Sequence, residues 1–216
     1  MTTLLEHAAE AMGLSPKQDL QLSSYDVVTA QEYPDFDKID AVLISGSKHN
    51  SFDNDPWILK LVDFTEKLLK QDRIRIIGVC FGHQILGRAL GVKVGRSDHG
   101  WEIAVLPVQL TAKGKELFQQ DTLQMHTDVV FEYPANVEKL GGSPRCLVQG
   151  MYQKGKLISV QGHPEFTEPI VSYLVKMRAG QGIFSEEQAK DALERVGNPH
   201  DGLVIAKAFL RFLLEE

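Results

Sequence analysis

One cysteine stands in a setting that suits a nucleophile. Cys80 follows the apolar run 76–79, has Gly78 and Gly82 two positions away on either side, and leads into the largely apolar segment 85–90. A strand that turns at once into a helix needs glycine at these positions, because the two backbones approach closely there. The amide groups at the helix start favour a thiolate over a thiol. The pattern therefore predicts a nucleophile elbow that presents one activated cysteine.

A cysteine nucleophile needs a base, and the base needs a carboxylate that orients it. His163 is the best candidate among seven histidines, because it follows the apolar stretch 157–161, and catalytic groups of open α/β sheets collect where strands end. Glu165 is two residues further on, so that both side chains of an extended segment point to the same side. Pro164 restricts the backbone to that form. We therefore expect a triad of Cys80, His163 and Glu165.

Each candidate also has a plain structural interpretation. Cys80 could be a buried core cysteine, and His163 could be a turn residue that Glu165 caps. We expect His83 to be held by backbone or water rather than to act as a second base. No group of residues has metal-ligand spacing, so we expect no metal and no cofactor. Four histidines lack a partner pattern and are assigned no chemistry: His7, His49, His99 and His200.

The segments Gly-Val-Cys-Phe-Gly-His-Gln at 78–84 and Gly-His-Pro-Glu at 162–165 resemble the class I, triad-type glutamine amidotransferase domains and the related γ-glutamyl peptidases. The chain order Cys, His, Glu fits this family as well. The resemblance spans about residues 40–166. It implies hydrolysis of the γ-glutamyl amide of glutamine or of a γ-glutamyl peptide through a cysteine thioester.

The resemblance implies further site residues. Gly46 and Phe81 resemble the positions whose N–H groups form the oxyanion hole of the family. Gln84 resembles the glutamine that helps to hold the amino-acid end of the substrate. His126 and Asp128 belong to a segment that is similar to the loop bordering the same pocket. Trp101 and Glu102 resemble a position near the pocket of the family, and we interpret Trp101 as a structural residue.

Composition and charge narrow the class of function. The 216 residues carry a net charge of −6 and contain no basic tract, so we expect no nucleic-acid partner. No run of 18 apolar residues occurs, and residues 1–20 lack the apolar core of a signal peptide. We therefore expect no membrane partner and a cytoplasmic protein, in which Cys80 and Cys146 are free thiols rather than a disulfide.

Hydrophobic patterning places these residues on an α/β, flavodoxin-like fold with a doubly wound, mostly parallel sheet, flanking helices and a strand-rich second half. Asp55 is expected to cap one helix, and Ser185 with Gln188 to form a capping box on another. Helices are expected over 3–12, 56–70, 82–90, 169–179, 185–196 and 203–214. Strands are expected over 20–28 (an edge strand), 40–45, 73–79, 103–110, 122–125, 146–151 and 157–161.

We find no repeat or interdomain linker, so residues 1–216 are expected to form one domain, with the motif core at about 40–166 and C-terminal helices at about 168–214. Relatives begin with an apolar strand before the first helix, whereas this sequence starts where that helix starts. We therefore expect the sheet to lack its first strand, which would cost backbone pairing and stability.

The most specific interpretation is a cysteine-dependent glutaminase or γ-glutamyl amide hydrolase. Its substrate would be glutamine or a γ-glutamyl small molecule, and a synthase partner could accept the ammonia. Two alternatives stay open at this point. One is a catalytically silent binding or regulatory protein of the same fold. The other is a thiol-based stress sensor, because such proteins also carry an elbow cysteine.

Overall fold

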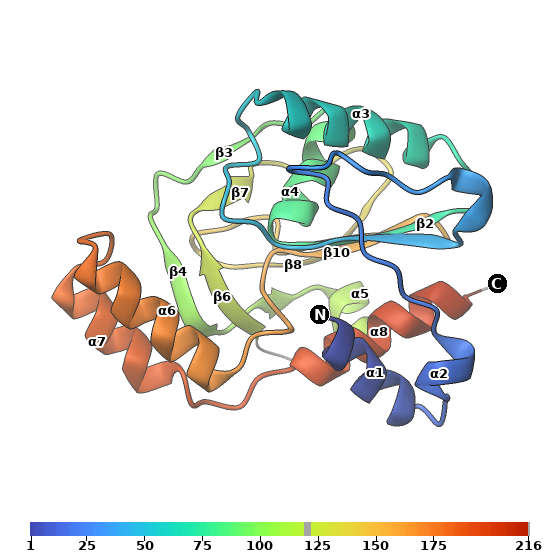
Figure 1. Ribbon diagram of the computed structural model, residues 1–216. Coiled ribbons are helices and arrows are strands. Elements are labelled where there is room, and N and C mark those ends of the chain that lie inside the picture. The colour runs from blue at the N-terminus through green and yellow to red at the C-terminus, as the bar shows by residue number, and fades with distance from the viewer. Residues whose placement is uncertain (119–121, 216) are drawn as a thin grey trace.

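The computed structural model describes residues 1–118 and 122–215, which build a central six-stranded sheet between helices (Figure 1). On one side of the sheet, β1 and β10 both pair in parallel with β2, which lies between them. β9, β8 and β5 extend the sheet from β10 by antiparallel pairing. In spatial order the strands are β1 (Ala41–Ile44), β2 (Arg75–Val79), β10 (Leu157–Val160), β9 (Gly150–Gln153), β8 (Glu138–Gly142) and β5 (Gln109–Leu110).

Helices cover both faces of this sheet. α3 (Pro56–Leu69) and α4 (Phe81–Ala89) lie on one face, and α1 (Thr2–Glu10) and α8 (Gly202–Leu214) lie on the other (Figure 1). Because both faces are covered, β10 is buried throughout and β2 from its second residue on, which explains their continuous apolar sequences. The α/β class is thus confirmed. Three shorter helical elements are α2 (Pro16–Asp19), η1 (Phe36–Lys38) and α5 (Ala112–Leu117).

A second group of elements stands beside the sheet (Figure 1). It contains two antiparallel strand pairs, β4 (Glu102–Leu106) with β6 (Thr122–His126) and β3 (Val94–Arg96) with β7 (Asp128–Val130). α6 (Glu168–Gly180) packs on α7 (Glu186–Arg195), and α7 packs on β4. The predicted capping box at the start of α7 is present. This group forms a layer next to the carboxyl ends of β2 and β10.

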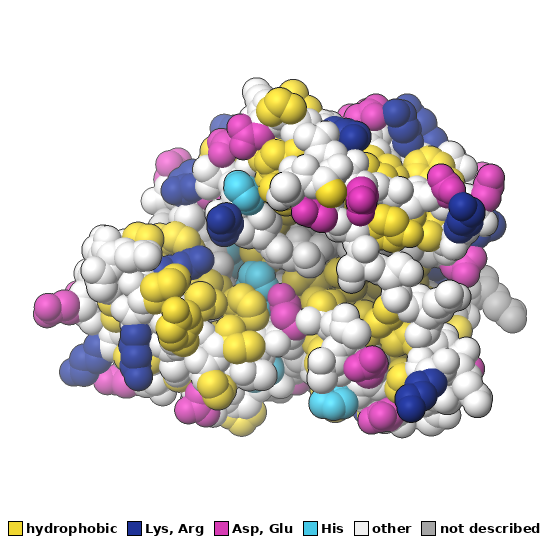
Figure 2. All heavy atoms as spheres, viewed as in Figure 1, with side chains coloured by type: hydrophobic (Ala, Val, Ile, Leu, Met, Phe, Trp, Pro, Cys, Tyr) yellow, Lys and Arg dark blue, Asp and Glu magenta, His cyan; other side chains and the backbone are white. Residues whose placement is uncertain are grey.

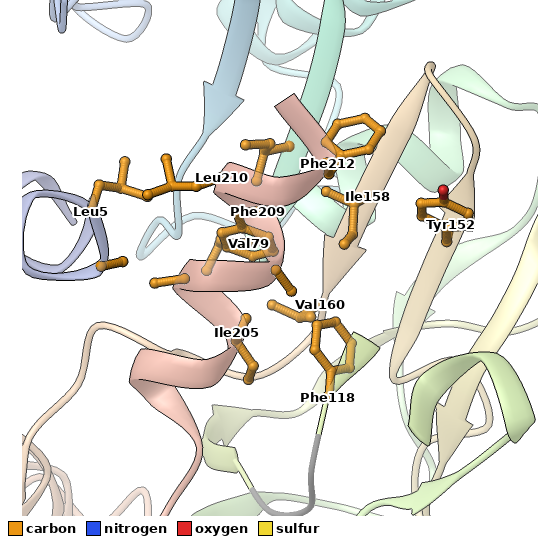
Figure 3. Close-up of a cluster of buried hydrophobic side chains, with 14 of the residues drawn as sticks. Leu5, Val79, Phe118, Tyr152, Ile158, Val160, Ile205, Phe209, Leu210 and Phe212 are labelled. Carbon is orange, nitrogen blue, oxygen red and sulfur yellow. The ribbon is translucent and has the colours of Figure 1, made fainter. Parts of the chain in front are cut away.

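The largest hydrophobic cluster supports the strand ends that carry the candidate triad (Figure 3). Ile205 and Phe209 of α8 are fully buried, and they share this cluster with Val79 of β2 and Val160 of β10. Residues 205 and 209 are one helical turn apart and face the same way. Packing of α8 therefore fixes the last residues of both strands.

Two predicted strands are wrong, wholly or in part, for local reasons. Residues 20–28 form no strand, because the Asp26 carboxylate accepts hydrogen bonds from the backbone N–H groups of Val28 and Thr29 at 2.9 and 2.8 Å. Such a turn competes with strand pairing. Of the predicted strand 146–151, only its last two residues lie in β9, because the Cys146 N–H bonds to Ser143 Oγ at 3.0 Å in a tight turn.

Smaller differences concern strand breaks and ends. The predicted strand 103–110 is divided into β4 and β5, and Pro107, which has no N–H for pairing, lies between them. Asp55 stands at the N-cap of α3, but its side chain makes no capping hydrogen bond. Within the described residues α1 is the first element, and β1 is one of the two edge strands of the sheet. No helix in the described ranges has the length and apolar character to span a bilayer.

Candidate active site

Cys80 lies between β2 and α4 in the predicted strand–turn–helix arrangement. Its backbone has φ +52° and ψ −103°, a conformation that non-glycine residues rarely adopt and that clusters at functional sites. Gly82 is required here, because a Cβ atom at this position would lie 2.0 Å from the Ile44 carbonyl oxygen. A Cβ atom at Gly78 would lie 2.7 Å from Leu86 Cδ1. The close approach of β1, β2 and α4 thus holds Cys80 in its unusual conformation.

His163 and Glu165 follow β10, the strand beside β2. Because β2 and β10 are parallel, with Val160 opposite Val79, their carboxyl ends lie at the same edge of the sheet. His163 Nδ1–H donates a hydrogen bond to Glu165 Oε1 at 2.9 Å. Phe166 stacks on the imidazole, with 4.0 Å between ring centroids and 2° between planes. The ring is therefore held in one orientation.

Gly46 lies directly against His163. A Cβ atom on Gly46 would stand 2.6 Å from His163 Cε1, so that any side chain at this position would displace the imidazole. Gly46 follows β1 by two residues, and β1 is the other parallel neighbour of β2. The segment that was expected to supply an oxyanion N–H thus stands beside the base.

The charges around His163 favour the imidazolium. Burial opposes a charge on this ring, but the Cys80 sulfur and the Glu165 carboxylate outweigh it and raise the pKa of His163 to about 10. Burial would raise the pKa of Glu165, whereas the hydrogen bond and charge of His163 lower it, and the net pKa lies below the ordinary value. The arrangement can therefore hold a protonated base between a thiolate and a carboxylate.

His83 is also buried but has different partners. Its Nε2–H donates to the Val148 carbonyl at 3.1 Å, and its Nδ1 accepts from Ser159 Oγ at 2.9 Å. Burial without a nearby carboxylate lowers the pKa of His83 to about 3. His83 is thus a neutral residue that links α4 to the sheet, and the expected backbone contact is present.

An open cleft of about 430 Å³ reaches Cys80. Figure 2 shows a hollow on this face of the molecule, between the α6–α7 pair and the layer of β1 and α3, with histidine side chains at its border and inside it. The cleft brings together three groups: Cys80, Phe81 and Gln84 of the elbow; residues 47–50 after β1; and Arg96, Trp101, residues 125–128 and Arg178 from the second group of elements.

Gln84 and Asp128 meet in the wall of this cleft. Gln84 Nε2 donates to the Asp128 carbonyl at 2.9 Å and to Gln161 Oε1 at 3.1 Å. The Asp128 carboxylate accepts from Arg96 Nε at 2.6 Å. The predicted strand 122–125 is present as β6, and the segment that resembles a loop is strand as well, because His126 ends β6 and Asp128 begins β7. The wall is thus a junction of two strands that Gln84 ties to the elbow.

His126 points from the cleft wall towards a buried carboxylate. Its Nε2 lies 3.1 Å from Glu102 Oε2, and both side chains are almost inaccessible to solvent. Glu102 also accepts hydrogen bonds from Ser143 Oγ and Gln149 Nε2, each at 2.7 Å. Burial would raise the pKa of Glu102, but His126, Ser143 and Gln149 together keep it below the ordinary value.

Within the described part of the chain, one group of side chains could hold a metal ion. Its members are Glu102, His126 and Cys146, whose ligand atoms lie within 4.8 Å of one another. Two observations favour an internal hydrogen-bond network instead. Both Glu102 oxygens already accept hydrogen bonds from side chains. Burial raises the pKa of the Cys146 thiol far above its ordinary value, which opposes the thiolate that binds metals. Both cysteines are free and buried.

Sequence reasoning missed several residues of the cleft. Trp101 was interpreted as structural, and it does pack on Phe184, but it also lines the cleft. Lys48 and His49 follow the Gly46 segment directly, and that position could have indicated them. Arg178 lies at the end of α6, far from every motif in the sequence. Only the packing of α6 on α7 and β4 brings it to the cleft.

Known proteins resemble the chain in sequence and in fold. The model of the family described as "Glutamine amidotransferase class-I" matches residues 2–169. A glutamine amidotransferase-like protein of Schizosaccharomyces pombe is 37% identical over 209 residues, which are 93% of this chain and 84% of that protein. Gamma-glutamyl peptidase 2 of Arabidopsis thaliana is 34% identical over 178 residues, 76% of this chain and 71% of that protein.

A solved structure shares the fold at lower sequence identity. The crystal structure of a glutamine amidotransferase from Thermotoga maritima superimposes with a TM-score of 0.74 at 19% identity, covering 98% of this chain and 90% of that chain.

Proposed function

The chain belongs to the class I glutamine amidotransferase family, and from this premise we propose that it hydrolyses γ-glutamyl amides through Cys80, His163 and Glu165. The observation that carries the proposal is the position of His163, which interacts with the Cys80 sulfur and donates to Glu165 Oε1 at 2.9 Å. A base between a nucleophile and an orienting carboxylate is the arrangement that acyl transfer needs.

In the first half-reaction, the Cys80 sulfur attacks the γ-carbonyl carbon of the substrate. The thiol proton has passed to His163 Nε2, and the imidazolium returns it to the nitrogen of the leaving amine as the C–N bond breaks. Ammonia leaves when glutamine is the substrate, and an amine leaves when the substrate is a γ-glutamyl peptide. The product on the protein is a γ-glutamyl thioester on Cys80.

In the second half-reaction, water attacks the thioester carbonyl. His163 takes one proton from this water, and the C–S bond breaks to release glutamate and regenerate the thiolate with its imidazolium. Glu165 keeps the proton on Nδ1, so that Nε2 faces the reacting atoms in both steps. The stacking of Phe166 on the imidazole supports the same orientation.

We propose the N–H groups of Gly46 and Phe81 as the oxyanion hole. Phe81 is the first residue of α4, directly after the nucleophile, and Gly46 contacts the imidazole of His163. Each donor of this kind typically lowers the barrier by about 3 kcal/mol. Gln84, His126 and Asp128 line the same cleft and are proposed to border the bound γ-glutamyl group.

The reaction subtype has two candidates. Similarity to gamma-glutamyl peptidases of Arabidopsis thaliana favours a hydrolase that acts alone on γ-glutamyl peptides. A glutaminase subunit that passes ammonia to a synthase partner is the second. Either reaction needs Cys80 as a free thiol, and a reducing compartment such as the cytoplasm keeps it in that state.

The test combines labelling with turnover. The purified chain is treated with a glutamine analogue that carries an electrophile in place of the amide, and the modified residue is mapped by mass spectrometry. Glutamate release is then measured from glutamine and from γ-glutamyl dipeptides. We expect labelling at Cys80 only, and glutamate release that is lost in Cys80→Ser and kept in the matched control Cys146→Ser.

Labelling of Cys146 as strongly as Cys80, or no glutamate release from any γ-glutamyl amide with or without a synthase, would contradict the proposal. The first result would favour a general thiol sensor. The second would favour a silent binding protein. Release that needs a synthase would identify the glutaminase subunit, and release by the chain alone would identify the hydrolase.

A further inference from the structure

Arg178 is a cation of the cleft that stands on a firm aromatic support. Its guanidinium carbon lies 4.9 Å from the ring centroid of Trp101 and 5.8 Å from that of Phe184. These two rings pack edge to face with centroids 5.1 Å apart. Planar stacking of this kind restricts an arginine side chain that would otherwise be mobile. The guanidinium is therefore held in place before any ligand binds.

This guanidinium has no anionic partner in the described part of the chain. Nη1 is buried and has no hydrogen-bond acceptor there, and no carboxylate of the described residues forms an ion pair with Arg178. Burial lowers the pKa of Arg178, and the charge of the Cys80 sulfur partly offsets this effect. Arginine side chains that are removed from water are normally paired, so the donor group of Arg178 is suited to an acceptor brought by a ligand.

The charge of the cleft favours an anionic ligand as well. Its lining contains three permanent cations, Lys48, Arg96 and Arg178, and a single carboxylate, that of Asp128. Arg96 holds this carboxylate at 2.6 Å, so that Asp128 is not available to neutralise the other two cations. Lys48 is exposed at the border, whereas Arg178 is half-buried. Arg178 is thus the better placed of the two for a desolvated ion pair.

We infer that Arg178 binds a carboxylate of the substrate and thereby selects γ-glutamyl compounds that carry it. The inference rests on the proposed function and adds a specificity-determining residue to it. The planar guanidinium can donate two parallel hydrogen bonds to a carboxylate, a geometry that lysine cannot reproduce. The carboxylate is either the α-carboxylate of the γ-glutamyl group or the terminal carboxylate of a peptide leaving group.

The experiment compares variants and substrates in a cycle. Arg178→Met and Arg178→Lys are compared with wild type, and Lys48→Met serves as the matched control because it removes another cation of the same cleft. The substrates are γ-glutamyl-glycine, its C-terminal amide, and its α-methyl ester. Each of the two analogues lacks one carboxylate of γ-glutamyl-glycine. With wild type and with Lys48→Met, we expect one of these analogues to react with a kcat/KM about 10- to 100-fold lower than that of γ-glutamyl-glycine. With Arg178→Met all three substrates should react alike, and Arg178→Lys should lie between.

The C-terminal amide and the α-methyl ester show which of the two carboxylates Arg178 binds. Discrimination against the methyl ester assigns Arg178 to the α-carboxylate, and discrimination against the C-terminal amide assigns it to the leaving group. Equal discrimination by wild type and Arg178→Met would overturn the inference. Should Arg178→Met fail to fold, as a thermal melt would reveal, Arg178→Lys decides by the same comparison.

Failure of the proposed function is separable from failure of this inference. Binding of glutamate, of its α-amide and of γ-glutamyl-glycine amide is measured by calorimetry on wild type and the Arg178 variants, which requires no turnover. Binding that weakens on loss of one carboxylate in wild type, but not in Arg178→Met, supports the inference even for a silent protein. Identical binding profiles for both chains would overturn it.

Discussion

The surroundings of His83 and His163 differ although both imidazoles are buried and lie near the carboxyl end of β2. The ring nitrogens of His83 bond to a neutral carbonyl and a hydroxyl, and burial lowers the pKa of His83 to about 3. His163 interacts with a sulfur and a carboxylate, and its pKa rises to about 10 against the same burial. Burial alone therefore suppresses the charge of a histidine, and charged partners decide whether it can carry a proton during a reaction.

Replacing each of the two histidines by asparagine should give the largest difference in activity between two variants. We expect His163→Asn to lower kcat for glutamate release by about 10⁴- to 10⁶-fold, because the base and the acid of both half-reactions are lost. The kcat of His83→Asn should stay within about threefold of the wild-type value, because His83 contacts no reacting atom. Glutamate release under saturating substrate measures both. Comparable losses in the two variants would remove the functional distinction between these sites.

Glu165→Gln tests whether the carboxylate causes the charged state of His163. We expect kcat/KM to fall by about 10²- to 10⁴-fold, because the amide can stabilise neither the required tautomer nor the imidazolium. Since Glu165 raises the pKa of His163, its removal should move the alkaline limb of the pH profile to lower pH. The limb is measured as kcat/KM from pH 6 to about 10.5. An unmoved limb would assign the raised pKa to Cys80 alone.

Gly46→Ala should disturb His163 without touching His83. The added Cβ would lie 2.6 Å from His163 Cε1 and force the ring to shift by a few tenths of an ångström or more. Small displacements of a reacting group are costly, so we expect a loss of about 10- to 100-fold in kcat/KM. Gly180→Ala is the control, because a Cβ there meets no atom within 4 Å. Equal activity of the two variants would show that His163 has room to adapt.

His83→Asn has its main effect on stability. We expect a loss of about 1–3 kcal/mol in the free energy of unfolding, because a buried carbonyl or hydroxyl loses its partner. The folded pKa of about 3 lies below the ordinary value of 6.5, so the contribution of His83 is present above pH 6.5 and lost as pH falls towards 3. Thermal melts of His83→Asn should therefore decline less over that acidic range than those of wild type.

The contribution of His163 to stability depends on pH in the opposite direction. Its folded pKa lies above 6.5, so its contribution to stability is present below pH 6.5 and is lost as pH rises through about 10. Melts of His163→Asn should therefore flatten the alkaline decline. Identical pH profiles for the two variants would contradict the contrast between the two environments.

The parts of the site that sequence patterns predicted are those fixed by local chemistry. The elbow depends on glycines within two residues of Cys80, and the His163–Glu165 hydrogen bond joins residues two positions apart. Both features can be inferred from residues that are close together in the sequence. The strand predicted over 20–28 failed because Asp26 forms a turn with its own backbone, an alternative that the apolar pattern does not contain.

Long-range packing explains what the sequence could not predict. Arg178 and Trp101 are far apart in the chain and meet only because α6 and α7 pack beside β4. β3 and β7 have three residues each, and the pairing of β8 with β9 is interrupted by a register shift, so these strands depend on pairing partners elsewhere in the chain. Residues that act through local geometry are thus accessible from sequence, whereas the cleft wall is a property of the folded chain.

The backbone of Cys80, at φ +52°, also restricts which amino acids evolution can place at that position. A threonine has two heavy atoms on Cβ, and at positive φ these collide with the neighbouring peptide groups. Serine keeps a single unbranched heavy atom and fits. At this backbone conformation serine is therefore a compatible replacement for the nucleophile, whereas threonine is strongly disfavoured.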